Sequence, residues 1–412
     1  MDFAPSQRAQ ELAEQATAFL HEQVLPAEPR FFAEVATLER EGAWGTPAVV
    51  EELKGRARER GLWNLFLPDP AHGPGVSVLD YAPTAEISGW SPWIMPEAMN
   101  CAAPDTGNME LLALFATPEQ TERWLEPLLA GEIRSCFSMT EPDVSSSDAR
   151  NIAASIVRDG DEYVITGRKW WSTGGMSPAC RVAVVMGVTD PDADAYTQQS
   201  MVLVPLDTPG VSVERSTTVF GYTDRAHGGH AVIGFDGARV PVTNLLGSQG
   251  AGFAMAQARL GPGRVHHCMR LIGMAERAID IMVRRAAART AFGRPLAAQG
   301  VVREKISRSR LAVDQARLLV LRTAWEIDRV GAKQAAAGIA AIKAVVPVMA
   351  CQVIDDAIQV LGGLGVSDDE VLAALYAAAR TLRIADGPDE VHHRSVARQE
   401  MRRVLGEQPR PA

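Results

Sequence analysis

The second half of the chain has apolar residues at helical spacing over long stretches. From Arg264 to Thr290 they recur every three or four residues, and helical segments continue through roughly 301–330, 334–361 and 368–384, with a last one from about 390. Short loops join these segments. Long helices with apolar stripes and short connections predict a four-helix bundle in the C-terminal part of the chain.

The middle of the chain alternates apolar and polar residues instead. Asp159-Gly160 lies between two alternating runs, which is a strong signal for a β-hairpin. Four further runs, RVAVVMGV, SMVLVPLD, VSVERS and HAVIGFDGARV, follow with turn residues between them. This pattern predicts a compact antiparallel, barrel-like β domain.

The first third of the chain carries helix start and stop signals. They predict one helix from Ser6 to about Gln23, ending near Pro26, a second from Thr46-Pro47 to Gly61, and a third from the capping box at Thr117 to Gly131. The order of helices, strands and helices is α+β by blocks, with domains expected at 1–132, 133–248 and 249–412. No GxGxxG follows a strand, so the sequence does not support a Rossmann-bound dinucleotide.

The composition is that of a globular protein. The 412 residues carry a net charge of −9, which does not favour a nucleic-acid partner, because phosphate binding needs a basic surface. The five cysteines have neither metal-ligand spacing nor a disulfide pattern, so we expect free thiols and no metal. The chain shows no signal-peptide run and no stretch of about 18 continuous apolar residues. We therefore expect a cytoplasmic protein without a membrane span.

Two short blocks have a composition that does not suit a core. The first is CFSMTEPDVSSSDA, Cys136–Ala149, and the second is GRKWWSTGG, Gly167–Gly175. They combine hydroxyl groups, glycines and two adjacent tryptophans. Such loops suit a flat ligand with polar edges, since they offer an aromatic face and hydrogen-bond groups together.

Both blocks resemble the flavin-holding loops of the acyl-CoA dehydrogenase family, and the resemblance spans nearly the whole chain. Within that family the chain most resembles the branch of the mammalian members ten and eleven. The family loop usually reads Gly-Ala-Gly-Ser-Asp after its proline, and here it is one residue longer, so Ser146 and Ser147 remain alternatives for the serine that contacts substrate or flavin. The resemblance implies FAD as cofactor and contacts from Phe137, Met139, Thr140, Ser147, Trp171 and Thr173.

Two later segments resemble parts of the family that reach a cofactor shared between subunits. Arg289-Thr290-Ala291-Phe292-Gly293 implies that Arg289 pairs with the pyrophosphate and that Phe292 packs near the adenine, and Gln299 is assigned to the same contacts. The glycine turn implies contacts from Gln359, Gly362 and Gly363. Read alone, these segments are a charged helix end and a glycine C-cap. Read together, they imply a homodimer or homotetramer.

A thioester α-proton is removed by a carboxylate in a dry pocket, where burial raises the carboxylate pKa. The carboxylate that matches the family base is Asp386, with Asp389 and Glu390 as rivals. The other position that the family uses falls near Gly263, where there is no carboxylate. Asp is one carbon, roughly 1.5 Å, shorter than the usual Glu. We therefore expect a closer backbone or substrate, or a substrate other than a plain acyl chain.

Arg264 and Gly387 are the further residues that the resemblance assigns to the substrate. Arg264 looks like the family arginine at the acyl or CoA entrance, and it can also pair with Asp386. The adjacent pairs His266-His267 and His392-His393 point to different helix faces. We interpret them as ordinary surface or core histidines rather than as a metal site.

Together the blocks predict an FAD-dependent acyl-CoA dehydrogenase that forms a 2,3-enoyl-CoA and passes electrons to an electron-transfer flavoprotein. An acyl-CoA oxidase or related flavin oxidase on the same fold is the alternative. A non-catalytic protein with this fold is a third hypothesis, and the intact flavin blocks argue against it. The residues do not identify the acyl chain, although Glu97–Leu112 is expected to line its pocket.

Overall fold

The computed structural model describes residues 5–406, and the chain folds into two compact units. The first, which we call the helical unit, comprises Met1–Glu22, Ser77–Met95 and Arg264–Ala412, and the second, the sheet unit, comprises Gln23–Val76 and Pro96–Gly263. Each unit therefore combines stretches that lie far apart in the sequence.

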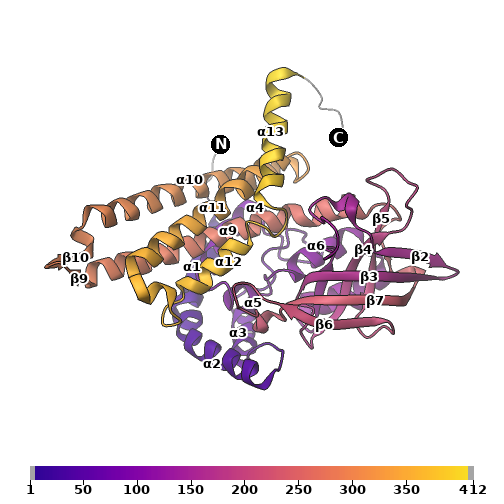
Figure 1. Cartoon of the computed structure of the whole chain (residues 1–412), viewed down its shortest axis with the longest axis horizontal. Helices are drawn as coiled ribbons and strands as arrows, with labels where there is room; N and C mark the ends of the chain where they lie inside the picture. The colour runs from indigo at the N-terminus through magenta and orange to yellow at the C-terminus, as the bar shows by residue number, and fades with distance from the viewer. Residues whose placement is uncertain (1–4, 407–412) are drawn as a thin grey trace. The chain divides into compact units, whose positions relative to one another are not determined.

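Long helices make up the helical unit (Figure 1). They are α1 Gln7–Phe19, α4 Val78–Ser88, the C-terminal part of α9 Gly252–Ala288, α10 Gly300–Val330, α11 Ala336–Leu361, α12 Leu372–Thr381 and α13 Asp389–Leu405. α10 packs against α11 and α4, and α11 packs against α12 and α13. The predicted helical C-terminal region is confirmed.

Two helices differ from the prediction. α9 begins at Gly252 rather than at Arg264, and α4 lies in a segment where no helix was predicted. Pro83 lies inside α4, and Gly261 and Gly263 lie inside α9; such residues usually interrupt helices. Packing against neighbouring elements therefore overrides the weak local preference.

The contact between α4 and α9 depends on two glycines. A Cβ atom on Gly89 would collide with the backbone carbonyl of Arg270, and one on Gly273 would collide with that of Glu86. The absence of side chains at these two positions lets the backbones approach closely.

The N-terminal helix does not end near Pro26, so that prediction is wrong. A π-helical segment, Leu20–Val24, follows α1 and continues directly into α2, Leu25–Glu41. Pro26 is the second residue of α2, so the missing proline N–H falls where the π-helical segment changes into the α-helix. A proline at this position is compatible with a continuing helix.

An eight-stranded sheet forms the sheet unit among the described residues (Figure 1). Its strands are β1 Arg134–Ser138, β2 Ser155–Asp159, β3 Glu162–Thr173, β4 Cys180–Val188, β5 Gln199–Pro205, β6 Val211–Thr217, β7 His230–Pro241 and β8 Leu245–Leu246. Their order is β6-β7-β3-β2-β4-β5-β8, with β1 beside β4. Asp159 pairs with Glu162, so the hairpin predicted at Asp159-Gly160 is confirmed.

Most neighbouring strands are antiparallel, as predicted, but two pairings are parallel. β1 runs parallel to β4, and β2 meets β4 in a parallel pairing. Parallel neighbours need a long connection between them. The loop after β1 and the β2–β3 hairpin both separate β1 from β4 in the sequence, so this condition is met.

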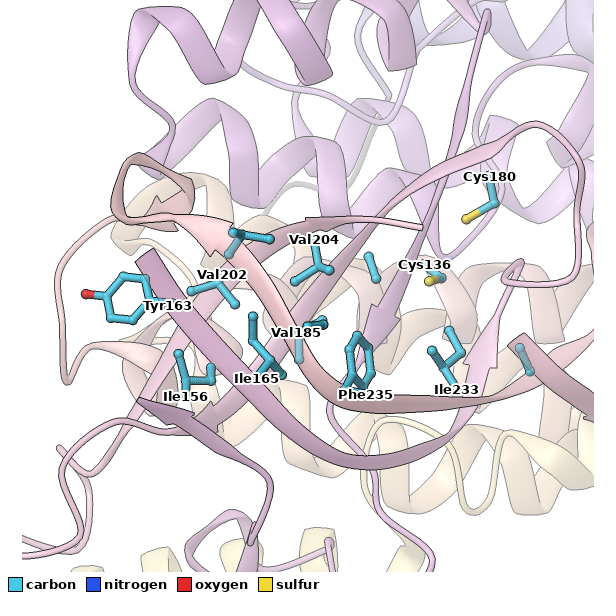
Figure 2. Packing of buried hydrophobic residues seen from close by; sticks show 14 residues of the cluster. Cys136, Ile156, Tyr163, Ile165, Cys180, Val185, Val202, Val204, Ile233 and Phe235 are labelled. Carbon is cyan, nitrogen blue, oxygen red and sulfur yellow. The ribbon is translucent and has the colours of Figure 1, made fainter. Parts of the chain in front are cut away.

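The strands bury one continuous apolar face (Figure 2). Ile156 and Ile165 pack with Val185, Val202 and Phe235 from other strands of the sheet. The five cysteines are free, as predicted, and all are buried. Because the alternating residues point inward, the polar residues of the same strands and their end loops remain available for a site.

Short helices complete the sheet unit: α3 Ala48–Glu59, α5 Met95–Ala98, α6 Asp105–Phe115, α7 Pro118–Gln120 and α8 Glu126–Ala130. The predicted capping box is present, since the Thr117 and Gln120 side chains each accept a hydrogen bond from the backbone N–H of the other residue. Gly131 ends α8 in a left-handed conformation, at the predicted stop.

By length and composition alone, the described stretch Ala336–Val366 could cross a membrane. However, 67% of its most apolar window is buried inside the protein. Core helices of soluble proteins pass the same test, so this stretch is weak evidence for a membrane span.

Buried charges gather around α6. Arg134 donates to Asp105 at 2.5 Å and to Glu97 at 2.7 Å, and Lys54 lies 3.1 Å from Glu97. Burial by itself would raise the pKa of Glu97, but Arg134 and Lys54 lower it to about 2. Glu110 differs, because its Oε2 atom has no hydrogen-bond partner among the described residues and burial raises its pKa to about 8, against the influence of Arg259.

Glu110 should make the protein less stable as the pH rises from about 4.5 to about 8. In this range the folded state holds a proton on Glu110 that the unfolded state has lost, so the free energy of unfolding decreases with pH. Each pKa unit corresponds to about 1.4 kcal/mol, so the loss should amount to a few kcal/mol. Urea unfolding of the parent protein and Glu110→Gln across this range measures it. The variant should show a smaller decrease, and equal pH slopes would contradict the prediction.

Candidate functional site

The loop after β1, which contains the first predicted block, is fastened to β3 and β4 by Lys169. The Lys169 ammonium is fully buried and donates to the Met139 carbonyl at 3.0 Å, the Glu141 carboxylate at 2.7 Å and the Met186 carbonyl at 2.6 Å. Burial lowers the pKa of Lys169 to about 8, and Glu141 opposes this effect. The Glu141 carboxylate also accepts from two backbone N–H groups, those of Ala153 and Ala154, both at 2.9 Å. One buried ion pair thus ties both ends of the loop to the sheet.

The hydrogen bond from Lys169 to the Met139 carbonyl sets the direction of the peptide between Met139 and Thr140. Because C=O and N–H point in opposite directions in a trans peptide, the Thr140 N–H points away from Lys169. Among the described hydrogen bonds this N–H has no partner, while the Thr140 carbonyl accepts from the Trp170 N–H at 3.0 Å. The loop therefore offers a free backbone donor next to the Thr140 hydroxyl.

The two candidate serines have different surroundings. Ser146 accepts a hydrogen bond from the Glu141 N–H at 2.9 Å and so stabilises its own loop. Ser147 is exposed. The geometry favours Ser147 as the serine that is available to a ligand.

The second block forms a bulge in β3. Lys169 pairs with Ile233 and Ser172 pairs with Ala231, so Trp170 and Trp171 together lie opposite a single residue of β7. Trp171 has a left-handed backbone with φ of 55°, and its side chain is 36% exposed. β-bulges commonly redirect a side chain next to a functional site.

The two blocks lie next to each other in the sheet unit. The hydroxyls of Ser138 and Ser172 are 2.8 Å apart, and Thr173 contacts the His230 ring. The Trp170 indole N–H is buried without a hydrogen-bond partner among the described residues. A partly exposed indole face, a free amide and an unpartnered buried N–H are a donor set that fits a flat heterocycle with polar edges, such as a flavin.

The residues that hold these blocks were not predicted. Lys169, Glu141 and His230 support the site from behind. One sequence signal existed for Lys169: in β3 it continues the inward-facing positions of Tyr163 and Ile165, where a charged residue is unusual.

The predicted base, Asp386, lies in the helical unit on the turn between α12 and α13. Lys343, which is buried, donates to the carbonyls of Leu382 at 2.6 Å and Ala385 at 2.9 Å. Arg264 donates to the Asp386 carbonyl at 2.9 Å. Since the Ala385 carbonyl faces Lys343, the Asp386 N–H points away from that ammonium. The carbonyls of this turn are thus bound to cations.

Asp386 itself has a left-handed backbone with φ of 57°, and Gly387 follows with φ of 102°. The sequence predicted that Arg264 can pair with Asp386. In the structure, Arg264 donates to the main-chain carbonyl of Asp386. His267 Nε2 lies 3.5 Å from Asp386 Oδ2, and His392 Nε2 lies 3.3 Å from the Asp386 carbonyl oxygen. Each histidine pair therefore places one ring at the candidate base. No sequence signal pointed to these contacts, because they join α9, α13 and the turn.

Burial and charge control the groups around this turn. Burial lowers the pKa of Arg264 and of Lys343, and the Asp386 carboxylate opposes the shift in both. Burial, followed by Arg264 and Lys343, lowers the pKa of His392 to about 4, so this ring is neutral near pH 7. The positive charge beside Asp386 thus comes from Arg264 and Lys343.

The rival carboxylates have other surroundings. Asp389 Oδ2 accepts from Arg383 at 2.7 Å at the start of α13, and Glu390 is exposed in the first turn of that helix. Both positions suit the N-terminal end of a helix. The geometry favours Asp386 over either as a base.

The two segments predicted to reach another subunit are exposed in the helical unit. Arg289 follows α9, and Phe292, on a hairpin of β9 Thr290–Ala291 and β10 Arg294–Pro295, is 99% exposed. Gln299 precedes α10 and accepts from Arg294 at 2.9 Å. The glycine turn residues at the end of α11 are also exposed: Gln359, Gly362 and Gly363. Within residues 5–406, no cluster of metal-ligating side chains is found.

Family models match three consecutive parts of the chain. The acyl-CoA dehydrogenase N-terminal domain matches residues 6–132, the middle domain residues 136–232, and the C-terminal domain residues 250–401.

Individual proteins are also similar over almost the whole chain. "Probable acyl-CoA dehydrogenase FadE2" of Mycobacterium tuberculosis is 56% identical and covers 98% of both chains. "Acyl-CoA dehydrogenase family member 11" of Homo sapiens is 49% identical over 97% of this chain, which spans 51% of that protein's length. A solved structure from Mycobacterium abscessus is 52% identical with a TM-score of 0.93, covering 97% of this chain and 99% of the other.

Lys169→Met should destabilise the sheet unit by roughly 3–5 kcal/mol, because Glu141 then stays buried without its counter-charge. The loop after β1 should also hold a bound ligand less firmly. Chemical denaturation measures the loss. The control is Lys169→Met combined with Glu141→Gln, which removes the leftover charge and should recover part of the stability. A single variant as stable as the parent would show that the ion pair does not hold the loop.

Proposed function

Because the chain belongs to the acyl-CoA dehydrogenase family, we propose that it is an FAD-dependent oxidoreductase that converts an acyl-CoA thioester into the 2,3-enoyl-CoA. The observation that carries this proposal is the Asp386 turn. There Lys343 and Arg264 bind the carbonyls on both sides of the Asp386 N–H, and the Asp386 carboxylate lies 3.5 Å from His267.

The residues proposed to hold the flavin ring lie on the two blocks of the sheet unit. Thr140 offers its N–H and hydroxyl, Trp171 its indole face, and Thr173 its hydroxyl, with Ser147 at the loop edge. Phe137 and Met139 continue the same strand and loop. When bound, FAD supplies the acceptor for the hydride that leaves the substrate β-carbon.

Asp386 is proposed to remove the α-proton of the thioester. Its N–H, turned away from Lys343, is suited to donate to the thioester carbonyl oxygen, where negative charge develops. Arg264 and Lys343 place positive charge beside the carboxylate, and Gly387 lets the chain pass close to the substrate.

The exposed segments support a second proposal, that two copies of the chain associate. An apolar ring that is 99% exposed, as at Phe292, is unfavourable in water and suits a contact with a partner. We propose that the hairpin residues Arg289, Phe292 and Gln299, and the turn residues Gln359, Gly362 and Gly363, reach FAD across a homodimer or homotetramer contact. An electron-transfer flavoprotein is the proposed electron acceptor, and the cytoplasm the proposed location.

Asp386→Asn should lower kcat with acyl-CoA substrates by at least ~100-fold, because general bases contribute roughly that much or more. Asn tolerates a left-handed backbone, so the turn and the bound flavin should be retained. Flavin absorbance per protein and steady-state rates measure the two effects separately.

Glu390→Gln is the matched control, since Glu390 is an exposed carboxylate on the adjacent helix turn. It should leave kcat nearly unchanged. Full activity in Asp386→Asn would overturn the assignment of the base, and loss of activity in Glu390→Gln would point to the rival. Protein that never binds flavin would overturn the proposed function as a whole.

A further inference from the structure

We propose that His230 is a positioning residue that orients the Thr173 hydroxyl toward the flavin and lets that hydroxyl donate in one flavin redox state and accept in the other. This inference rests on the proposed FAD site, because it takes Thr173 to lie near N5 of the flavin. It concerns only residues of the sheet unit.

Thr173 and His230 form a directly opposed pair at the ends of β3 and β7. Thr173 Oγ1 lies 3.0 Å from His230 Nδ1, within hydrogen-bond distance. The main chain of His230 is fixed on both sides, because its N–H donates to Ser216 Oγ at 2.9 Å and its carbonyl accepts from Thr217 Oγ1 at 3.1 Å. The Trp171 ring lies 5.3 Å from the imidazole, centroid to centroid. The imidazole is therefore held against both residues assigned to the flavin.

The Nε2 edge of the imidazole faces the turn that contains Asp224 and His227. Asp224 Oδ2 lies 4.0 Å from His230 Nε2, and Asp224 Oδ1 lies 2.7 Å from His227 Nδ1. Asp224 has a left-handed backbone with φ of 50°. The Gly174 N–H, directly after Thr173, donates to the Gly229 carbonyl of this turn at 2.9 Å. The turn and the end of β3 are thus one rigid assembly.

The charges around His230 leave its ring neutral near pH 7. Burial lowers its pKa, and Asp224 opposes the shift. Burial acts to lower the pKa of His227, but Asp224 raises it above its ordinary value. Glu97 and Arg134 act on His227 with opposite signs. Asp224 and His227 are the charged groups that act on His230 itself.

A neutral imidazole carries one N–H, and either ring nitrogen can hold it. With the proton on Nε2, Nδ1 accepts from the Thr173 hydroxyl, and Thr173 Oγ1 presents its lone pairs to the flavin. With the proton on Nδ1, the ring donates to Oγ1, and the Thr173 O–H turns to the flavin as a donor. Oxidised flavin N5 is an acceptor and reduced N5–H is a donor. A change of tautomer at His230 therefore matches Thr173 to both states.

The test is a double-mutant cycle of Thr173→Val and His230→Phe in the full chain, with flavin removed and FAD added back. The dissociation constant is measured by flavin fluorescence for oxidised FAD in air and by ultrafiltration for reduced FAD under anaerobic dithionite. Each single change should raise it about two- to tenfold, the effect of one net hydrogen bond. In both redox states the dissociation constant of the double variant should equal that of the single variant that binds FAD more weakly, because the two residues act as one unit.

Each alternative result has a definite meaning. If the fold-changes that the two single variants cause in the dissociation constant multiply in both redox states, the positioning role of His230 is overturned. If the two residues are coupled in only one redox state, the proposed switch of the Thr173 hydroxyl between donor and acceptor is overturned. His230→Asn, which keeps a donor and an acceptor near the Nδ1 position, should bind FAD within about twofold of the parent, and His230→Leu replaces His230→Phe if that variant does not fold. A parent protein that binds no FAD would overturn the proposed function, whereas a parent that binds FAD with multiplicative effects overturns this inference alone.

Discussion

The buried Lys169 ammonium is the interaction on which the candidate cofactor loop depends. It neutralises Glu141 and binds the Met139 and Met186 carbonyls, so one side chain joins the loop after β1 to β3 and β4. A charged group without water requires such complete pairing, since an unpaired buried charge is strongly unfavourable. These contacts hold the loop in a conformation that leaves the Thr140 N–H without a partner among the described hydrogen bonds.

Lys343 serves the same purpose in the helical unit. It binds the Leu382 and Ala385 carbonyls, and Arg264 binds the carbonyl of Asp386. In both units a buried cation takes up the carbonyls of an irregular segment and so directs the adjacent N–H the opposite way. This arrangement prepares backbone donors before a ligand arrives, and it places positive charge behind a segment whose ligand is expected to develop negative charge.

The sequence predicted what local chemistry determines. The hairpin at Asp159-Gly160 and the capping box at Thr117 followed from residues within four positions of one another, and both are present. The continuation of the N-terminal helix through Pro26 and the parallel pairing of β1 with β4 did not, because both depend on hydrogen bonds or packing that local residue types do not specify.

The candidate site shows the same division. Its ligand-facing residues lie in two contiguous blocks with an unusual composition, so they could be read from the sequence. Their supports could not, because His230 meets Thr173 and His267 meets Asp386 only through strand pairing and helix packing. The histidine pairs were interpreted as ordinary residues because adjacent positions face different sides of a helix. One member of each pair lies at Asp386 for that same reason, while its neighbour points elsewhere.

Trp171 and Asp386 share a left-handed backbone, which costs a non-glycine residue about 1–3 kcal/mol. Such strain persists only where the surroundings determine the conformation completely. At Trp171 the surroundings are the bulge in β3 and the His230 ring, and at Asp386 they are the carbonyl contacts of Lys343 and Arg264. If either residue returned to an ordinary backbone conformation, its side chain would turn away from its present direction. Each unit by itself therefore gives up some stability locally, the sheet unit so that an indole face is held in place before any ligand binds, and the helical unit so that a carboxylate is.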